Sequence, residues 1–94
     1  MVLDSAIVNP KSSIVNLIMY EEMVEYIVQG LVDHPDQVSV TVDERQSSIN
    51  IEVSVADDDT GRVIGRRGKV INAISTILQV RGDIDGKRIS IDLI

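Results

Sequence analysis

The sequence predicts an α+β fold of two layers, in which helices pack on one face of a three-stranded mixed sheet. Three segments alternate apolar and polar residues, which is typical of strands that are buried on one side only. Elsewhere, apolar residues recur at spacings of three and four, which indicates amphipathic helices. The resulting order is helix, strand, strand, helix, helix, strand, and a chain of 94 residues suits one such domain.

The first helix is expected over residues 20–32. Its apolar side chains recur at spacings of four, three and four, so they share one face. This stripe comprises Tyr20, Val24, Ile27 and Leu31. The helix should end at His34-Pro35, because the residue before a proline avoids the helical region. His34 is the only histidine and has no cysteine to join, so it is interpreted as a boundary residue and not as a ligand or catalytic group.

Residues 1–18 are harder to place and are treated as an appendage to a single domain over residues 19–94. The apolar residues from Ile14 to Ile18 allow three alternatives. The first alternative is a backward extension of the first helix with a serine as its cap. The second is an added strand, and the third is a flexible N-terminal segment. The sequence alone leaves these alternatives open.

Two alternating segments predict a β-hairpin. Apolar residues of the first strand are Val38, Val40 and Val42. Apolar residues of the second strand are Ile49, Ile51, Val53 and Val55. Residues 44–47 form the turn between them. The carboxylates of Asp57-Asp58-Asp59 come next and are predicted to cap a short helix that begins near Thr60. A divalent metal site is the alternative for three successive carboxylates, but no matching ligand spacing follows them.

The stretch from Thr60 to Ile71 holds three of the six glycines and four of the nine basic residues. It predicts a short helix, a tight turn at Gly65-Arg66-Arg67-Gly68, and a second helix that runs to about Val80. Glycine reaches backbone conformations outside the right-handed region and removes side chains that would block a close ligand. Unpaired N–H groups at the start of the second helix and the neighbouring cations predict a site that clamps phosphates.

Other glycine-containing phosphate sites do not fit this spacing. A P-loop requires a glycine five residues before Gly68, where Val63 stands, and a serine or threonine after Lys69, where Val70 stands. The dinucleotide-binding motif requires a glycine at the same Val63 position and a strand directly upstream. Neither motif is therefore present.

The second helix of this region carries two apolar stripes. One stripe comprises Ile71, Ile74 and Leu78, and the other comprises Val70, Ala73, Ile77 and Val80. One stripe should meet the sheet, and the other should meet a neighbouring helix or another molecule. Residues 81–86 are expected to form a turn-rich loop before a last strand. A right-handed crossover would make that strand parallel to the second one.

The pattern Val-Ile-Gly-x-x-Gly-x-x-Ile, complete from Val63 to Ile71, resembles the KH domain. The predicted element order resembles the type II-like arrangement of this domain, which is the bacterial form, over residues 19–94. Residues 23–27, 31–38 and 86–91 further resemble the small bacterial single-KH proteins of the KhpA family. In KH domains the Gly-x-x-Gly loop clamps about four nucleotides of single-stranded nucleic acid.

This resemblance implies a non-enzymatic protein that binds single-stranded RNA, of the RNA chaperone or post-transcriptional regulator type. The family pairs with a second KH-containing protein, KhpB (also called Jag or EloR), and influences cell elongation and division, so a homodimer or such a complex is expected. Residues 81–86 would correspond to the variable loop, whose Asp83 and Asp85 argue against RNA contact there. The RNA-binding residues implied by position are Gly61, Arg62, Ile64, Gly65, Arg66, Arg67, Gly68, Lys69, Ile71, Lys87 and Arg88.

The charge distribution is compatible with a basic binding patch despite a net charge of −6. Residues 1–60 carry two basic and twelve acidic side chains, whereas residues 61–94 carry seven basic and three acidic ones. Binding depends on the local field of a patch and not on the total charge. The lack of cysteine, of a long apolar run and of a secretory signal leads us to expect a cytoplasmic protein.

Three other classes of function compete with this interpretation. A protein-interaction module with little RNA binding is the main alternative, favoured by the negative charge and opposed by the intact Gly65-Arg66-Arg67-Gly68 loop. An enzyme is disfavoured because the chain offers no cysteine, one histidine and no triad, and no cofactor or metal is expected. A helix-turn-helix DNA binder is disfavoured because residues 69–80 are too apolar for a recognition helix.

Overall fold

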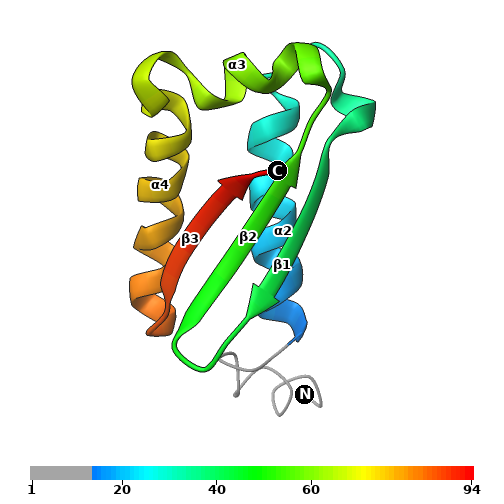
Figure 1. Ribbon diagram of the computed structural model, residues 1–94. Coiled ribbons are helices and arrows are strands. Elements are labelled where there is room, and N and C mark those ends of the chain that lie inside the picture. The colour runs from blue at the N-terminus through cyan, green and yellow to red at the C-terminus, as the bar shows by residue number, and fades with distance from the viewer. Residues whose placement is uncertain (1–13) are drawn as a thin grey trace.

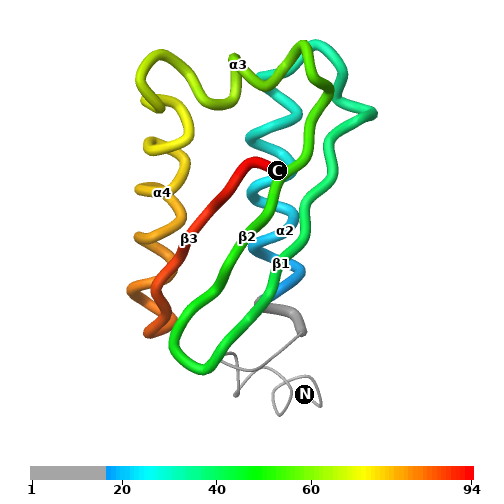
Figure 2. Tube along the Cα trace, in the orientation of Figure 1, coloured from blue at the N-terminus to red at the C-terminus, as the bar shows by residue number. Residues whose placement is uncertain are grey.

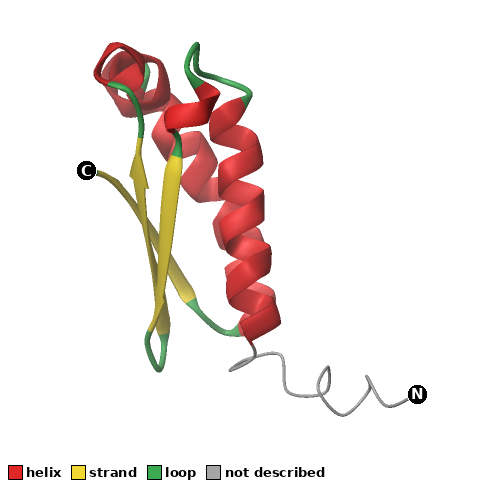
Figure 3. Cartoon of the chain, turned by 90° about the vertical axis from the view of Figure 1, so that its right-hand side faces the viewer, coloured by secondary structure: helices red, strands yellow, loops and turns green. Residues whose placement is uncertain are grey.

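The computed structural model describes residues 14–94 and shows a sheet with helices on one face (Figures 1 and 3). The elements are α2 (Ile14–Gln29), β1 (Ser39–Glu44), β2 (Ser48–Ser54), α3 (Thr60–Ile64), α4 (Lys69–Asp85) and β3 (Arg88–Leu93). Short 3-10 turns lie at Pro35–Gln37, Asp57–Asp59 and Arg66–Gly68. Within the described residues, no helix is both long enough and apolar enough to cross a membrane.

The sheet has the strand order β1-β2-β3, with β2 in the centre (Figure 2). Strands β1 and β2 are antiparallel, with Val40 opposite Val53. Strands β2 and β3 are parallel, with Ile49 opposite Ile89. The α3–α4 segment supplies the crossover between the two parallel strands, so the predicted mixed sheet and element order are confirmed.

The core lies between the sheet and helices α2 and α4, because each strand turns its apolar side chains to that face. The central strand contributes most, with three side chains that are fully buried. The buried apolar residues are Tyr20, Val24, Val28, Val40, Ile49, Ile51, Val53, Val63, Ile74, Leu78 and Ile89. Truncating a large residue of this set to alanine would cost about 2–5 kcal/mol of unfolding free energy.

Helix α2 differs from the prediction at both ends. It begins at Ile14, so residues 14–18 extend the helix backwards, as one of the three alternatives proposed. The expected boundary at residue 19 therefore falls inside α2, whereas residues 1–13 lie outside the described part of the chain. The helix ends at Gln29 and not at His34-Pro35, because the chain tightens at Gly30 and Leu31, whose N–H donates to the Val28 carbonyl at 2.9 Å.

Helix α4 continues to Asp85, so the predicted loop over residues 81–86 is wrong. Gly82 belongs to the helix interior, where a Cβ atom would come within 2.8 Å of the Lys87 carbonyl oxygen. Its glycine serves the close approach of α4 to the start of β3 and not a turn. The helix ends at Gly86, which has a φ of +72° and is followed by a hydrogen bond of 2.8 Å from Lys87 N–H to the Gly82 carbonyl.

A buried polar triad also holds the last turn of α4. The Tyr20 hydroxyl donates to Asp85 Oδ2 at 2.7 Å, and Arg81 Nε lies 3.3 Å from the same oxygen. Both Tyr20 and Asp85 are buried, and burial together with the hydrogen bond to Asp85 raises the pKa of the Tyr20 hydroxyl. Asp85 is therefore a structural partner of α2. Only Gly86 and Lys87 link α4 to β3, so no variable loop separates them.

Candidate nucleic-acid interface

The turn between α3 and α4 has a backbone that requires glycine at two positions. Gly65 has φ and ψ of 75° and 173°, a conformation essentially restricted to glycine, and a Cβ atom there would overlap the Val70 side chain. Gly68 is left-handed, with a φ of 74°. The sequence-based turn is thus confirmed, and its glycines are needed by the backbone itself.

Arg67 lies in the same turn with a φ of 59° and a ψ of 29°. Among the described residues it is the only non-glycine residue with a positive φ. The left-handed conformation costs an L-residue with a side chain roughly 1–2 kcal/mol. A helical residue followed by a left-handed one forms a concave arrangement of N–H groups that suits an anion. Within the turn, the N–H groups of Gly68 and Lys69 donate to the carbonyls of Gly65 and Arg66. The positive end of the α4 dipole still favours an anion at this place.

Three cations surround this turn. Arg66, Arg67 and Lys69 are exposed, and together with Asn72 they line an open pocket of about 500 Å³. Within the part of the chain that the structure describes, none of the three cations has a carboxylate within ion-pair distance. Asn72 was not among the residues expected at the site. Its place one helical turn after Gly68 was the available signal, since such residues share a helix face.

The other predicted residues near the turn have more varied surroundings. Arg62 Nη2 lies 3.2 Å from Asp33 Oδ2, so this cation is partly neutralised. Ile64 is exposed beside the turn, whereas Ile71 is half-buried. A Cβ atom at Gly61 would meet no atom within 4 Å, so nothing in the folded chain requires glycine there.

Lys87 and Arg88 lie at the opposite end of α4 from the turn (Figure 1). The 17 residues of α4 separate the two places by about 25 Å at the usual helical rise. The Lys87 side chain is only 8% exposed, because its Nζ donates to the carbonyls of Arg45 and Gln46 and pairs with Glu44 at 3.0 Å. The Lys87 ammonium therefore stabilises the β1–β2 hairpin. Arg88 is exposed.

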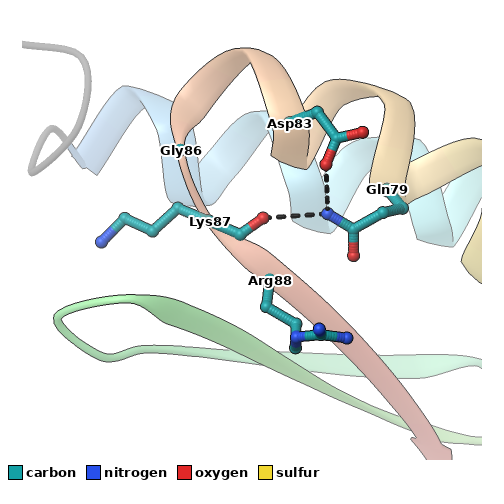
Figure 4. Close-up of a pocket in the computed structure, with 5 residues that line it drawn as sticks. All are labelled: Gln79, Asp83, Gly86, Lys87 and Arg88. Atoms are coloured by element: carbon teal, nitrogen blue, oxygen red, sulfur yellow. Dashed lines mark hydrogen bonds between the residues drawn. The ribbon is translucent and has the colours of Figure 1, made fainter.

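A second, shallow pocket of about 350 Å³ lies at this far end of α4 (Figure 4). The Gln79 amide nitrogen donates to Asp83 Oδ1 at 2.9 Å and to the Lys87 carbonyl at 3.0 Å. Its amide oxygen accepts the Ile89 N–H at 2.9 Å. Gln79 therefore fastens the end of α4 to β3, and its polar atoms are already used within the protein.

The predicted capping role of Asp57-Asp58-Asp59 is wrong. These residues form a 3-10 turn, and Asp59 makes no side-chain cap hydrogen bond to α3. Its buried carboxylate instead accepts hydrogen bonds from Asp33 N–H at 3.1 Å and His34 N–H at 3.0 Å, and His34 Nδ1 lies 3.0 Å from it. His34 thus has a specific partner 25 residues away, a contact that no local pattern indicates. Within residues 14–94, no acidic or histidine cluster could hold a metal ion.

Helix α4 leaves one apolar stripe in contact with solvent. Of the stripe expected over residues 70–80, Val70 packs against the core, whereas Ala73, Ile77 and Val80 are exposed. Ile84 continues the row, and the three large side chains are 53–70% exposed. The stripe extends for about 16 Å along the helix. The other stripe, which contains Ile74 and Leu78, meets the sheet as predicted.

The sequence of this chain is similar to a known protein family. A family model described as "KhpA/KhpB, KH domain" matches residues 21–93. A protein of Listeria monocytogenes serovar 1/2a named "RNA-binding protein KhpA" is 39% identical over 74 residues, which cover 79% of this chain and 97% of that protein. A protein of Streptomyces coelicolor with the same name is 40% identical over 76 residues, which cover 81% and 92%.

A further relative of that name, from Borreliella burgdorferi, is 36% identical over 73 residues, which cover 78% of this chain and 89% of the relative. No solved structure matches the chain significantly. The matched region contains all the described strands and the complete turn at Gly65–Gly68. The chain therefore belongs to the KhpA/KhpB family of KH domains.

Proposed function

We propose that this protein binds single-stranded RNA without catalysing a reaction, by holding the phosphate backbone at the turn from Gly65 to Gly68. The observation that carries the proposal is the strained turn, where three exposed cations without an ion-pair partner among the described residues lie at the positive end of the α4 dipole. Its relatives are named RNA-binding proteins, which supports the same conclusion. A role as a cytoplasmic RNA chaperone or post-transcriptional regulator belongs to this proposal.

The clamp consists of Gly65 to Gly68 and Lys69, and the exposed Ile64 offers an apolar surface for a base. Contacts to phosphates hold the strand without reading its sequence. A module that contacts about four nucleotides binds weakly, so two linked copies or a partner would raise the affinity. Arg88 is proposed to contact only a longer RNA, because it lies at the other end of α4, whereas the Lys87 ammonium beside it is held by the β1–β2 hairpin.

The test is a fluorescence-anisotropy titration of short single-stranded RNA at several salt concentrations. Replacing Arg66 and Arg67 by aspartate should lower the affinity about tenfold or more, which is about 1.4 kcal/mol, because two anions would face the phosphates. The salt dependence should become shallower by about 0.7 in slope for each lost phosphate contact. Arg88→Asp reports on the far end of α4 in the same assay.

The single variant Arg67→Asp is measured as well, and Arg45→Asp is its matched control, since it makes the same change in charge at the exposed tip of the hairpin. Circular dichroism checks that each variant is folded. Equal RNA binding by wild-type protein and the Arg66/Arg67 variant at every salt concentration would exclude the clamp. The protein-interaction function, which the exposed stripe of α4 favours, would then replace it.

We propose that the α4 stripe, defined as Ala73, Ile77, Val80 and Ile84, joins a second copy of the chain or a related KH protein of the KhpB type. The stripe can cover itself in a two-fold antiparallel pair, because its exposed apolar side chains would pack against those of the second copy.

Ile77→Glu should abolish this association, because it would bury an unpaired carboxylate at the centre of the stripe. Tyr26→Glu is the control, as Tyr26 is an exposed side chain on α2. Light scattering measures the mass of each variant over a range of concentrations. A wild-type protein that remains a 10.3 kDa monomer throughout would remove the homodimer.

A further inference from the structure

Among residues 17–94, Asp59 is the one fully buried carboxylate near the proposed RNA clamp, and its hydrogen bonds lead away from α3. We propose that Asp59 and His34 form a latch that positions α3, and with it the turn from Gly65 to Gly68, for RNA binding, and that proton uptake by His34 tightens this latch. The inference rests on the proposed RNA-binding function. Neither residue contacts RNA in this proposal, so both are positioning residues.

The latch joins two segments that are distant in sequence. Asp59 is 1% exposed, and its carboxylate accepts the N–H groups of Asp33 and His34 as well as the contact from His34 Nδ1. Asp33 and His34 lie between the end of α2 and the 3-10 turn at Pro35–Gln37. Asp33 also pairs with Arg62 of α3 at 3.2 Å. Two contacts thus connect the segment after α2 to α3.

The clamp depends on this connection because α3 is short. Its five residues from Thr60 to Ile64 form little more than one turn, and a helix of this length is unstable without tertiary contacts. Val63 anchors one side in the core, and Asp59, the residue just before the helix, is held by its hydrogen bonds to the segment after α2. Gly65 follows α3 directly, so a shift of α3 moves the clamp.

A partly open latch would lower RNA affinity without unfolding the protein. When only a fraction of the molecules holds the binding-competent arrangement, the apparent dissociation constant rises by the inverse of that fraction. Contacts that keep the latch closed are therefore measurable as RNA affinity. The same contacts contribute less to global stability, because the rest of the core remains packed.

The latch should respond to pH through His34, whose side chain is 42% exposed and exchanges protons with solvent. The charged groups around it are Asp59 and Asp58 of the 3-10 turn, Asp33 of its own segment, and Arg62 of α3, which pairs with Asp33. The hydrogen bond to Asp59, and then the nearby carboxylates, raise the pKa of His34 above its ordinary value of 6.5.

Burial alone would raise the pKa of Asp59, but hydrogen bonds from Asp33 and His34 outweigh it and hold this pKa below 3.8. The stabilisation from His34 is complete below its unfolded-state pKa and is lost as pH rises through the raised folded-state pKa. The stabilisation from Asp59 is present above its ordinary pKa and is lost only in acid. RNA affinity should therefore fall as pH rises above 6.5 and through the raised pKa of His34.

The first experiment compares Asp59→Asn with Asp58→Asn, which removes the same charge from the same turn at an exposed position. Asparagine at position 59 offers a single acceptor oxygen, so it cannot accept all the present donors. We expect RNA affinity to fall about tenfold in Asp59→Asn and to stay within about twofold in Asp58→Asn. Equal affinities in the two variants would overturn the latch.

The second experiment uses His34→Gln, which keeps a hydrogen-bonding side chain but does not titrate, so it should fold normally. The pH dependence of RNA affinity should disappear in this variant, whereas wild-type protein loses affinity about threefold or more between about pH 6 and pH 8.5. In the wild type without RNA, the amide signals of Gly65 and Gly68 in NMR spectra should shift with the same midpoint as the His34 ring.

The two proposals fail in distinguishable ways. If wild-type protein binds no RNA, the proposed function fails, and the NMR titration still tests the latch. The latch is refuted if RNA binds with the same pH dependence in wild type and His34→Gln. It is also refuted if the glycine amide signals do not shift with the midpoint of the His34 ring. Neither result contradicts the clamp. A direct effect of the histidine charge on RNA would weaken at high salt, because salt screens exposed charges. An effect on RNA affinity through the position of α3 would persist at high salt.

Discussion

The two ends of α4 contain the same kinds of residue but have different tasks. Each end has two glycines, Gly65 and Gly68 before the helix and Gly82 and Gly86 at its end, with several charged residues among them. At the start, both glycines have a positive φ and three nearby cations have no ion-pair partner among the described residues. At the end, one glycine lies inside the helix, and Arg81, Asp85 and Lys87 have ion-pair partners.

If the proposed function is correct, the partners of a charge, and not the charge itself, separate the binding end of α4 from its structural end. Lys87 contacts Glu44 and two carbonyls of the hairpin, and Arg81 contacts the buried Asp85. The hydrogen bonds of these groups are made to protein partners in place of water, so few donors remain for a ligand. The charges of Arg66 and Arg67 are not neutralised by a carboxylate among the described residues. They lie at the helix N-terminus, where the helix dipole also attracts a phosphate.

The largest expected effect on stability is at Gly82. In Gly82→Ala the new methyl group would meet the Lys87 carbonyl and the Ile89 side chain, so we expect a loss of about 2 kcal/mol of unfolding free energy. Gly61→Ala is the matched control, because nothing lies near its Cβ position and alanine favours a helix by about 0.5–1 kcal/mol. Denaturant titration of both variants measures the difference. If Gly82→Ala is as stable as wild type, the proposed packing role of this glycine is wrong.

Tyr20→Phe tests the polar triad at the same end of α4 and should have a smaller effect. The variant keeps the buried ring but removes the hydroxyl that donates to Asp85 at 2.7 Å. Arg81 would remain beside Asp85, so the loss should be about 1–2 kcal/mol. Thermal unfolding measures this change, and RNA affinity serves as the control because the triad is remote from the clamp. An RNA affinity that falls together with stability would show that the two ends of α4 are coupled.

Sequence reasoning predicted the architecture because alternation and helical spacing are local signals. The three strands, the mixed sheet and the Gly65–Gly68 turn are confirmed. It misplaced the ends of α2 and α4, because Gly30 ends a helix without a proline and Gly82 continues one despite being glycine. The second case depends on how closely β3 approaches α4, and local sequence contains no information about that distance.

The site was predictable only where its residues are neighbours in the chain. The residues of the proposed clamp lie within five positions of each other, so motif spacing alone was enough to propose them. The contact of Asp59 with His34 joins residues 25 positions apart, and the burial of the Lys87 charge requires the hairpin to fold first. Sequence reasoning therefore missed both contacts. It interpreted Asp59 as a helix cap, which is wrong, and it offered Lys87 to RNA without knowing that the hairpin surrounds its ammonium.

The smallest effect is expected at Arg67, and it should have opposite signs for stability and for binding. Arg67→Gly relieves a left-handed conformation that costs roughly 1–2 kcal/mol with a side chain. Glycine also loses about 0.5–1 kcal/mol more through chain entropy on folding, so the net gain in stability should be about 0.5 kcal/mol. RNA affinity should fall about threefold, with a salt dependence shallower by about 0.7 in slope, because one phosphate contact is lost.

Arg66→Gly is the control for this prediction, since Arg66 lies in the same turn without a positive φ. It should lose RNA affinity to a similar extent but should not gain stability, because no strain is relieved. Denaturant midpoints and anisotropy titrations on the same samples give both quantities. If Arg67→Gly is less stable than wild type, the left-handed conformation of Arg67 does not lower the stability of the protein, and no stability is given up for RNA binding. The turn would then resemble the far end of α4, where backbone and charge serve the fold alone.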